Sequence, residues 1–343
     1  MSTKKSHLSL GKITGGFQNA KARLFATLPM FLVLALFSVS ITSNALSFPI
    51  FGRNKLAVKS EYINKKDIKG LDLNLQIWFP KSKKPVPTII FFTGMTGLIT
   101  SKVYASFIKQ MVSKGMSVIT FHSSRNYPGQ FKITAEESYR SYLTLKEELN
   151  KHLVKKHRGI AAELINWDQT VLMGHSSGAQ PVIAFYRQAL GEIKGIVLLD
   201  PVDGDPFGKT EKVIKEGEQN GFKAPLLISG TEFCKQPGYK HKWFPPCCPA
   251  GLSSEHFFAA FEGPKRYVNA VEYAHVDLLD DGFAWVANKT RFCKPSEGAD
   301  KNLIKTFNAE MITDFVNNNV SQLRSDFPYL KQGQHKIKID IFE

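Results

Sequence analysis

Short apolar runs alternate along this chain with longer segments in which apolar residues recur at helical spacing. The apolar runs predict buried strands at residues 73–79, 87–92, 116–121, 171–173, 193–199, 224–229 and 267–273. The helical spacing predicts helices at residues 102–113, 134–157, 180–190 and 300–323. Strands that alternate with helices favour an α/β architecture, with a mostly parallel central sheet and helices on both faces. We therefore expect one α/β domain over residues 50–343.

The sharpest local signal is a Gly-x-Ser-x-Gly motif directly after the run at 171–173. Ser176 is its centre, with Gly174 and Gly178 two positions away on either side, and a segment compatible with a helix follows. A strand, a tight turn and a helix in this order form a nucleophile elbow, which presents the central hydroxyl at the end of the sheet. Ser176 is therefore the candidate nucleophile.

A serine hydroxyl needs a base to take its proton, and a carboxylate to orient that base. On an elbow scaffold the acid and then the histidine follow the serine, each at the carboxyl end of a later strand. Asp200 comes directly after the run at 193–199 and is the candidate acid. Asp203, three residues further on, and Glu232, after the next predicted strand, are the alternatives.

The candidate base is His275, which follows the last predicted strand and so belongs to the same edge of the sheet. His175 lies inside the elbow, where we expect its side chain to point away from the ester. His122 ends a strand that precedes the elbow, and His256 lies in the helical run at 254–261. We therefore expect the nucleophile, the acid and the base to meet at one edge of the sheet.

Ester hydrolysis also requires two backbone donors for the oxyanion of the transition state. One is expected to be the N–H of Ser177, directly after the nucleophile. The other is expected to be the N–H of Met95, because Gly94 allows the turn after the strand at 87–92 to approach the carbonyl oxygen.

The net charge of +15 does not by itself indicate an anionic partner. Residues 1–60 carry eight lysines and arginines and no acidic residue, which leaves +7 for the remainder of the chain. That remainder has no dense stripe of basic and aromatic residues and no nucleic-acid motif, so nucleic acid is not an expected partner. The hydrophobic content of 43% and charged content of 22% are typical of a globular protein with a sizeable core.

The four cysteines, Cys234, Cys247, Cys248 and Cys293, do not have the spacing of a zinc site, since a vicinal pair cannot supply two corners of a zinc knuckle. In an oxidising compartment Cys234 can bridge to Cys247 or Cys248, whereas reduced, partly buried thiols are the alternative. No phosphate-binding loop or metal cluster competes with the elbow. The sequence therefore predicts ester hydrolysis without a cofactor or a metal.

Residues 1–49 have the order of segments expected of a targeting sequence. A basic stretch without acids is followed by an apolar run at 25–42 and by small residues at 43–45. This is the order of a secretory signal and its cleavage site, which predicts entry into the secretory route. An uncleaved signal anchor, which would associate the protein with a membrane, is the alternative. Phe48, followed by basic residues, resembles the bipartite presequences of secondary plastids and favours a plastid location.

The segment 233–261 concentrates aromatic residues and prolines between the last two predicted strands. These residues are Trp243, Phe244, Pro245, Pro246, Phe257, Phe258 and Phe261. Such a loop forms an apolar rim around a binding site or buries its aromatic rings within itself. In either case a large apolar substrate is easier to accommodate than a small polar one.

Together these motifs give the chain a strong resemblance to the chlorophyllases. The matching motifs are Gly-His-Ser at 174–176 with Gly at 178, Leu-Asp-Pro-Val-Asp-Gly at 199–204, Phe-Pro-Pro-Cys at 244–247, Glu-His-Phe-Phe at 255–258 and Tyr-Ala-His-Val-Asp-Leu-Leu-Asp-Asp at 273–281. The resemblance implies an α/β-hydrolase fold and a serine esterase that cleaves the phytyl ester of chlorophyll to chlorophyllide and phytol. It also implies that Ser176, Asp200 and His275 form the catalytic triad.

Two positions depart from the usual pattern of that family. Ser177 stands where the family usually has arginine, and Thr93 stands where it usually has histidine before the glycine of the oxyanion turn. Both changes leave the backbone donors intact and bear on the shape of the pocket. Two further functions are open: a lipid esterase of the same fold, similar to platelet-activating-factor acetylhydrolases, and an inactive hydrolase scaffold that binds pigment or lipid.

Overall fold

The computed structural model describes residues 56–122, 131–204, 211–215, 222–238, 245–284, 293–318 and 339–342. The targeting or anchor segment expected at 1–49 lies outside these residues. Within the described ranges, no helix is both long enough and apolar enough to cross a bilayer.

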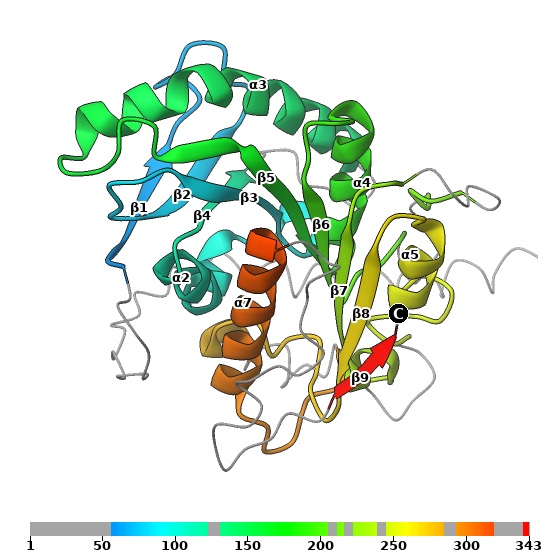
Figure 1. Cartoon of the computed structure of the whole chain (residues 1–343). Coiled ribbons are helices and arrows are strands. Elements are labelled where there is room, and N and C mark those ends of the chain that lie inside the picture. The colour runs from blue at the N-terminus through cyan, green and yellow to red at the C-terminus, as the bar shows by residue number, and fades with distance from the viewer. Residues whose placement is uncertain are drawn as a thin grey trace, which may run out of the picture. The chain divides into compact units, whose positions relative to one another are not determined.

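In the described part of the chain, nine strands form one sheet in the order β1-β2-β4-β3-β5-β6-β7-β8-β9 (Figure 1). The strands are β1 (Val58–Ile63), β2 (Asn74–Pro80), β3 (Val86–Phe92), β4 (Ser117–His122), β5 (Ile165–His175), β6 (Gly195–Leu199), β7 (Leu226–Thr231), β8 (Lys265–Ala270) and β9 (Ile339–Phe342). The six strands from β4 to β8 in this order are parallel to their neighbours. Antiparallel pairing adds β2 and β1 at one edge and β9 at the other. The predicted mostly parallel sheet is confirmed.

Helices cover both faces of this sheet, as the alternation of strands and helices predicted. They are α2 (Ala105–Ser113), α3 (Phe131–Lys156), α4 (Ala179–Gln188), α5 (Ser254–Ala260) and α7 (Lys301–Asn318), with short 3₁₀ turns η1 (Met95–Gly97), η2 (Ser101–Tyr104), η3 (Ser176–Gly178) and η4 (Glu232–Lys235). Successive residues of a strand face opposite sides. Ile90 and Leu172 therefore pack in the core of α3, α4 and α5, whereas Ile89 and Val171 pack in the core of α2 and α7. Burial on both faces explains why the central strands are continuously apolar.

The edges of the sheet differ from the sequence-based expectation. β1 was not predicted, because Lys59, Ser60 and Glu61 interrupt any apolar run, and the strand is only partly buried. β8 was predicted to extend to residue 273 as the last strand, but it ends at Ala270, and β9 follows it in the sheet. Glu272 has a φ of 69°, a conformation that a strand does not accommodate.

The four cysteines form two disulfides, Cys234–Cys248 and Cys247–Cys293. One of the bridges considered from the sequence is therefore present, and the alternative of reduced thiols is not what the structure shows. The vicinal pair is divided between two partners. As a result the segment that begins at Pro245 is tied both to η4 and to the chain before α7.

The aromatic residues of segment 233–261 do not form one continuous rim. Phe257 and Phe261 are fully buried in the core beneath α5, and Phe258 is partly buried against the same core. Trp243 and Phe244 lie outside the described residues. Phe257 and Phe261 therefore fold the loop onto the sheet, and the rim interpretation is wrong for them.

Candidate active site

The strand, turn and helix expected around Ser176 are present. β5 ends at His175, Ser176 has a φ of 57°, and η3 leads directly into α4. A Cβ on Gly174 would lie 2.6 Å from the carbonyl oxygen of Gly178. A Cβ on Gly178 would lie 2.3 Å from the carbonyl oxygen of Phe92. Only glycine fits at either position, because the backbone at 174 packs directly on the backbone at 178, and the backbone at 178 packs directly on the end of β3.

The elbow places Ser176 at the carboxyl edge of the parallel strands. Its side chain is neither fully buried nor fully exposed. Its carbonyl oxygen accepts a hydrogen bond of 3.0 Å from the N–H of Val202, which fixes the elbow to the loop after β6. The backbone of Ser176 is therefore fixed to the loop after β6, while the residue as a whole stays partly exposed.

Asp200 follows β6 directly, as predicted, and its carboxylate is buried. Thr231, at the end of β7, donates its N–H to Oδ1 and its hydroxyl to Oδ2, each over 2.7 Å. Oδ2 also lies 3.5 Å from Nδ1 of His275. Thr231 thus holds both carboxylate oxygens in the orientation that turns Oδ2 toward the imidazole.

His275 lies five residues beyond the end of β8, in a turn shaped by Asp277. The Asp277 carboxylate accepts the N–H of Ala274 over 2.8 Å, and the N–H of Asp277 donates to the Ala274 carbonyl over 3.0 Å. Burial raises the pKa of the Asp277 carboxyl. The predicted residue is therefore close to the acid, but a turn rather than a strand end positions it.

Asp280 ties this turn to two helices on one face of the sheet. Its carboxylate accepts hydrogen bonds from the N–H of Ser106 over 3.2 Å and from the Ser106 hydroxyl. Lys305 of α7, itself buried, reaches the same carboxylate over 3.2 Å. The loop that carries His275 is thus anchored to α2 and α7.

The ring of His175 packs against the imidazole of His275. The two rings are stacked with centroids 4.6 Å apart, and Nε2 of His175 lies 3.2 Å from the carbonyl oxygen of His275. Nδ1 lies 2.8 Å from the hydroxyl of Tyr104. Because the carbonyl can only accept, Nε2 carries the proton, and Nδ1 accepts from Tyr104. The His175 ring therefore lies beside the candidate base, whereas its place in the elbow had led us to expect a side chain that points away from the ester.

The buried position of His175 excludes it as the catalytic base. Burial first, and then the nearby His275, hold the pKa of His175 well below its ordinary value. The ring is therefore neutral, and both of its nitrogens are engaged. It acts as a positioning residue for the imidazole above it.

The turn after β3 lies against the elbow. Met95 and Thr96 each have a φ of 52°, and the N–H of Thr96 donates to the Ser177 hydroxyl over 2.9 Å. Within the described turn 94–99, each backbone N–H other than that of Met95 donates a hydrogen bond that the structure shows. The N–H of Met95 is left for an acceptor from outside the turn.

The alternative acids serve other purposes. Asp203 accepts the N–H groups of Val213 and Ile214 over 2.6 and 3.0 Å and lies 2.9 Å from Nε2 of His256. Glu232 accepts the N–H of Glu272 over 3.0 Å. The first carboxylate therefore binds the backbone at residues 213 and 214, and the second fixes the turn at Glu272 before the candidate base.

His122 remains at the end of β4, as predicted. Burial, followed by the charge of Lys102, lowers its pKa. Among the described residues, the imidazole within ion-pair distance of Asp200 is that of His275.

Sequence reasoning missed three supporting side chains: Tyr104, His175 as a support, and Thr231. A signal existed for Thr231, because it ends the strand next to that of Asp200, and a hydroxyl at that point can reach across the sheet edge. The predicted strand stopped two residues too early to reveal it. Tyr104 gives no such signal, since it precedes a helix far from the elbow in the chain.

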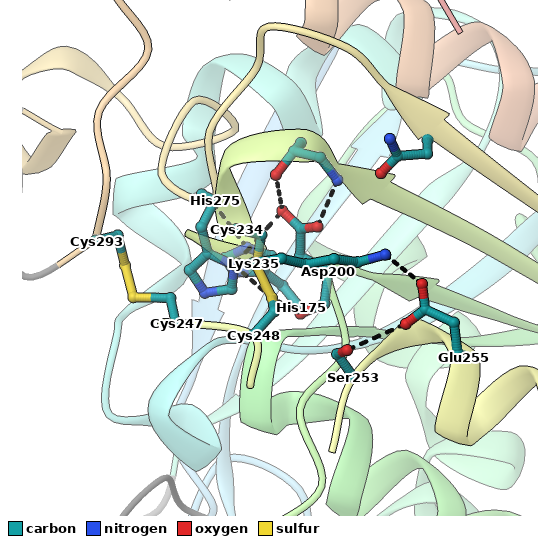
Figure 2. The surroundings of a disulfide bond; sticks show 12 residues. His175, Asp200, Cys234, Lys235, Cys247, Cys248, Ser253, Glu255, His275 and Cys293 are labelled. Carbon is teal, nitrogen blue, oxygen red and sulfur yellow. Dashed lines mark hydrogen bonds and ion pairs between the residues drawn. A yellow bond between two sulfur atoms is a disulfide. The ribbon is translucent and has the colours of Figure 1, made fainter. Parts of the chain in front are cut away.

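One cluster of potential metal ligands occurs among the described residues, and it surrounds the same imidazole. Ligand atoms of Asp200, Cys234, Cys248 and His275 all lie within 4.8 Å of one another. Figure 2 shows the Cys234–Cys248 disulfide beside the side chains of Asp200 and His275. Sγ of Cys234 is 3.1 Å from Nδ1 of His275, but sulfur is a weak acceptor, so the carboxylate is the stronger partner for the Nδ1 proton.

Comparison with known proteins places the chain in a family. The chlorophyllase family model matches residues 47–342. The chain is 27% identical to Chlorophyllase-2 of Arabidopsis thaliana over 190 residues, which are 52% of this chain and 59% of that protein. It is 24% identical to Chlorophyllase-1 of Arabidopsis thaliana over 222 residues, which are 60% of this chain and 63% of that protein. The chain thus spans about three-fifths of the length of the curated relatives it matches.

Proposed function

This chain belongs to the chlorophyllase family, and we propose that it hydrolyses the phytyl ester of chlorophyll to chlorophyllide and phytol. The observation that carries the proposal is the position of the His275 imidazole. Its Nδ1 lies 3.5 Å from the Asp200 carboxylate, and its ring is stacked on that of the residue directly before Ser176. An acid, a base and an elbow serine at one edge of a parallel sheet are the parts of a serine esterase.

In this proposal Ser176 Oγ attacks the ester carbonyl carbon while Nε2 of His275 takes its proton. Nδ1 faces Asp200, so Nε2 is the ring nitrogen left to act as the base, and the carboxylate stabilises the imidazolium that forms. The oxyanion accepts hydrogen bonds from the N–H groups of Ser177 and Met95. Each such donor contributes about 3 kcal/mol to the transition state.

The second half of the reaction uses the same groups in reverse. The tetrahedral intermediate breaks its bond to the phytyl oxygen, and phytol leaves with the proton from His275. Water then gives a proton to the same imidazole and attacks the acyl-enzyme. The products are the chlorophyllide carboxylate and a free Ser176 hydroxyl, so one water is consumed for each ester cleaved.

The choice of pigment ester as substrate is supported by the family and by the names of the two Arabidopsis thaliana relatives. Ser177 and Thr93, which depart from the family pattern, both lie beside the oxyanion turn. The first accepts the N–H of Thr96 through its side chain. These two positions are where we propose that the preference among pigment esters is set.

The test is chlorophyllide release by the purified full chain from chlorophyll in detergent micelles. Ser176→Ala is expected to lower the rate by at least about a thousandfold, since it removes the nucleophile. The matched control is Ser113→Ala, which also replaces a serine by alanine. Ser113 ends α2, at the opposite end of that helix from Tyr104, so this variant is expected to retain the rate. Chlorophyllide release that survives in Ser176→Ala would refute the mechanism.

The same preparation separates the pigment esterase from a lipid esterase. It is incubated in parallel with a phospholipid that carries a short acyl chain. Cleavage of the phospholipid with no chlorophyllide from chlorophyll would replace the proposed substrate while leaving the catalytic groups in place. Cleavage of neither substrate would favour the inactive scaffold.

A further inference from the structure

The Cys234–Cys248 disulfide lies directly against the imidazole of the proposed base (Figure 2). Nδ1 of His275 is 3.1 Å from Sγ of Cys234, 3.7 Å from Sγ of Cys248 and 3.5 Å from Oδ2 of Asp200. All four side chains are buried. They come from the loop after β6, from η4, from the segment after Pro245 and from the turn after β8, so no spacing in the sequence reveals the cluster.

We propose that reduction of this disulfide by a dithiol converts the cluster into a tetrahedral binding site for a zinc-like ion. We further propose that the bound ion switches the esterase off. The second statement rests on the proposed function, whereas the first concerns the four side chains alone.

The distances already approach those of a tetrahedral site. With Zn–S near 2.3 Å and Zn–N or Zn–O near 2.0–2.2 Å, a sulfur and a nitrogen ligand lie about 3.5 Å apart, and a nitrogen and an oxygen about 3.4 Å. The three distances from Nδ1 of His275 agree with these values to within about 0.5 Å. The two sulfurs must separate from their bonded distance to about 3.8 Å, which breaking the disulfide permits because they belong to different segments.

The chemistry of the donors selects the metal. The dithiol transfers two electrons and two protons to the disulfide and is itself oxidised to a disulfide. The ion then displaces the protons of both thiols and binds two thiolates, one imidazole and one carboxylate. Thiolate and imidazole ligands in tetrahedral geometry suit Zn²⁺ rather than Mg²⁺ or Ca²⁺. Asp200 keeps its hydrogen bonds from Thr231 while it contributes Oδ2.

Metal at Nδ1 would invert the tautomer that the esterase needs. In the proposed mechanism Nδ1 carries the proton and Nε2 accepts from Ser176. An imidazole that binds metal through Nδ1 carries its proton on Nε2, so it cannot accept another. The same ion also draws the Asp200 carboxylate away from its role as the partner of the imidazolium. The loaded form is therefore inactive, whereas the disulfide form has no thiolates to offer.

The second disulfide provides a matched control. Cys247 directly precedes Cys248 in the sequence, but among the described residues no group of three potential ligands forms around the Cys247–Cys293 disulfide. Cys247→Ser/Cys293→Ser therefore leaves the proposed site complete. Cys234→Ser/Cys248→Ser removes both sulfur ligands from it.

The experiment uses the full chain as wild type and as these two double variants. Each is reduced with a phosphine under anaerobic conditions, freed of reductant by gel filtration and titrated with Co²⁺. Alkylation followed by mass spectrometry verifies which disulfides have opened. We expect the wild type and Cys247→Ser/Cys293→Ser to bind one Co²⁺ per chain, with the charge-transfer and ligand-field bands of a tetrahedral thiolate site. Cys234→Ser/Cys248→Ser is expected to lack those bands.

The activity of the same samples with Zn²⁺ tests the switch. Reduced wild type is expected to lose at least about 90% of its esterase rate at one equivalent of Zn²⁺, because an imidazole without an acceptor nitrogen contributes little as a base. The rate is expected to return when a chelator removes the ion. The oxidised protein is expected to be unaffected. Cobalt bound with no loss of rate would overturn the switch.

Three results would overturn the site itself: no thiolate bands in the reduced protein, equal bands in Cys234→Ser/Cys248→Ser, or a disulfide that the reductant cannot open in the folded chain. Ser176→Ala is titrated as well, and it is expected to bind Co²⁺ normally because the serine is not a ligand. Oxidised, metal-free wild type that releases no chlorophyllide, together with normal cobalt bands after reduction, would refute the proposed function and leave the metal site standing.

Discussion

The hydroxyl of Tyr104 is the point at which removal of a single atom should damage both the stability and the catalysis of this protein. It is fully buried, accepts the N–H of Gly94 over 3.1 Å and donates to Nδ1 of His175 over 2.8 Å. Burial raises the pKa of Tyr104 far above its ordinary value, so the hydroxyl stays protonated and remains a donor. One atom therefore connects the oxyanion turn to the ring beneath His275.

Tyr104→Phe leaves the Gly94 N–H and the His175 Nδ1 buried with no partner. Each unsatisfied buried group costs about 1–3 kcal/mol, so the loss of two partners should lower the free energy of unfolding by about 2–6 kcal/mol. The rate should fall as well, because Gly94 precedes Met95 and its release moves a proposed oxyanion donor. Losing half of the contribution of one donor lowers kcat by roughly tenfold.

Urea unfolding followed by circular dichroism measures the first effect, and chlorophyllide release measures the second. Tyr186→Phe is the matched control, because its buried hydroxyl accepts the N–H of Ala224 over 3.2 Å away from the elbow. We expect the control to lose about 1–3 kcal/mol of stability, since one buried group is left unsatisfied, and to retain its kcat. If Tyr104→Phe behaves like this control in both assays, the link from the turn to the imidazole does not contribute as described.

Two further predictions rest on contacts of the same site, and a third rests on the sequence of the N-terminal segment. Thr231→Val removes the hydroxyl that donates a hydrogen bond to Asp200 Oδ2, and it should lower kcat/KM by about tenfold, because a hydrogen bond to a charged group contributes about 1.5–3 kcal/mol. Thr231→Ser keeps a hydroxyl and should retain kcat/KM. An unchanged kcat/KM in Thr231→Val would contradict the role given to Thr231. His175 is neutral when folded but takes up a proton near its ordinary pKa of about 6.5 when unfolded, so stability should fall as the pH drops below that value, by up to about 1.4 kcal/mol per pH unit. Urea unfolding at pH 5, 6 and 7.5 measures how the free energy of unfolding changes with pH, and this change should be smaller in His175→Gln than in the wild type. The same change with pH in both proteins would show that His175 does not titrate as described. We also propose that residues 1–49 direct the chain into the secretory route: intact-mass measurement should find a mature N-terminus near residue 46, whereas a retained Met1 in a membrane fraction would indicate a signal anchor.

The central part of the fold and the elbow could be predicted from the sequence because they are set by local patterns. The strands β3 to β7 are buried on both faces, so their apolar runs are uninterrupted and easy to recognise. Gly174 and Gly178 mark a turn that no larger residue fits. Asp200 could be located because it follows an apolar run directly.

Features that depend on contacts between distant segments could not be predicted in this way. β1 is an edge strand with polar residues, and its stability comes from pairing with β2 rather than from its own pattern. The division of the vicinal cysteines between Cys234 and Cys293 depends on where three loops meet. The support of His275 by a neighbouring imidazole likewise arises only when the elbow and the turn after β8 are brought together.

Covalent labelling with a fluorophosphonate tests the central claim most directly, because the reagent reports an activated serine whatever the natural substrate is. The full chain is labelled, digested and mapped by mass spectrometry, together with Ser176→Ala and His275→Ala. The account predicts one label per chain on Ser176, no label in the alanine variant at that position, and labelling slowed by at least about a hundredfold in His275→Ala. A label on another residue, or labelling of Ser176 at full rate without the imidazole of His275, would contradict it.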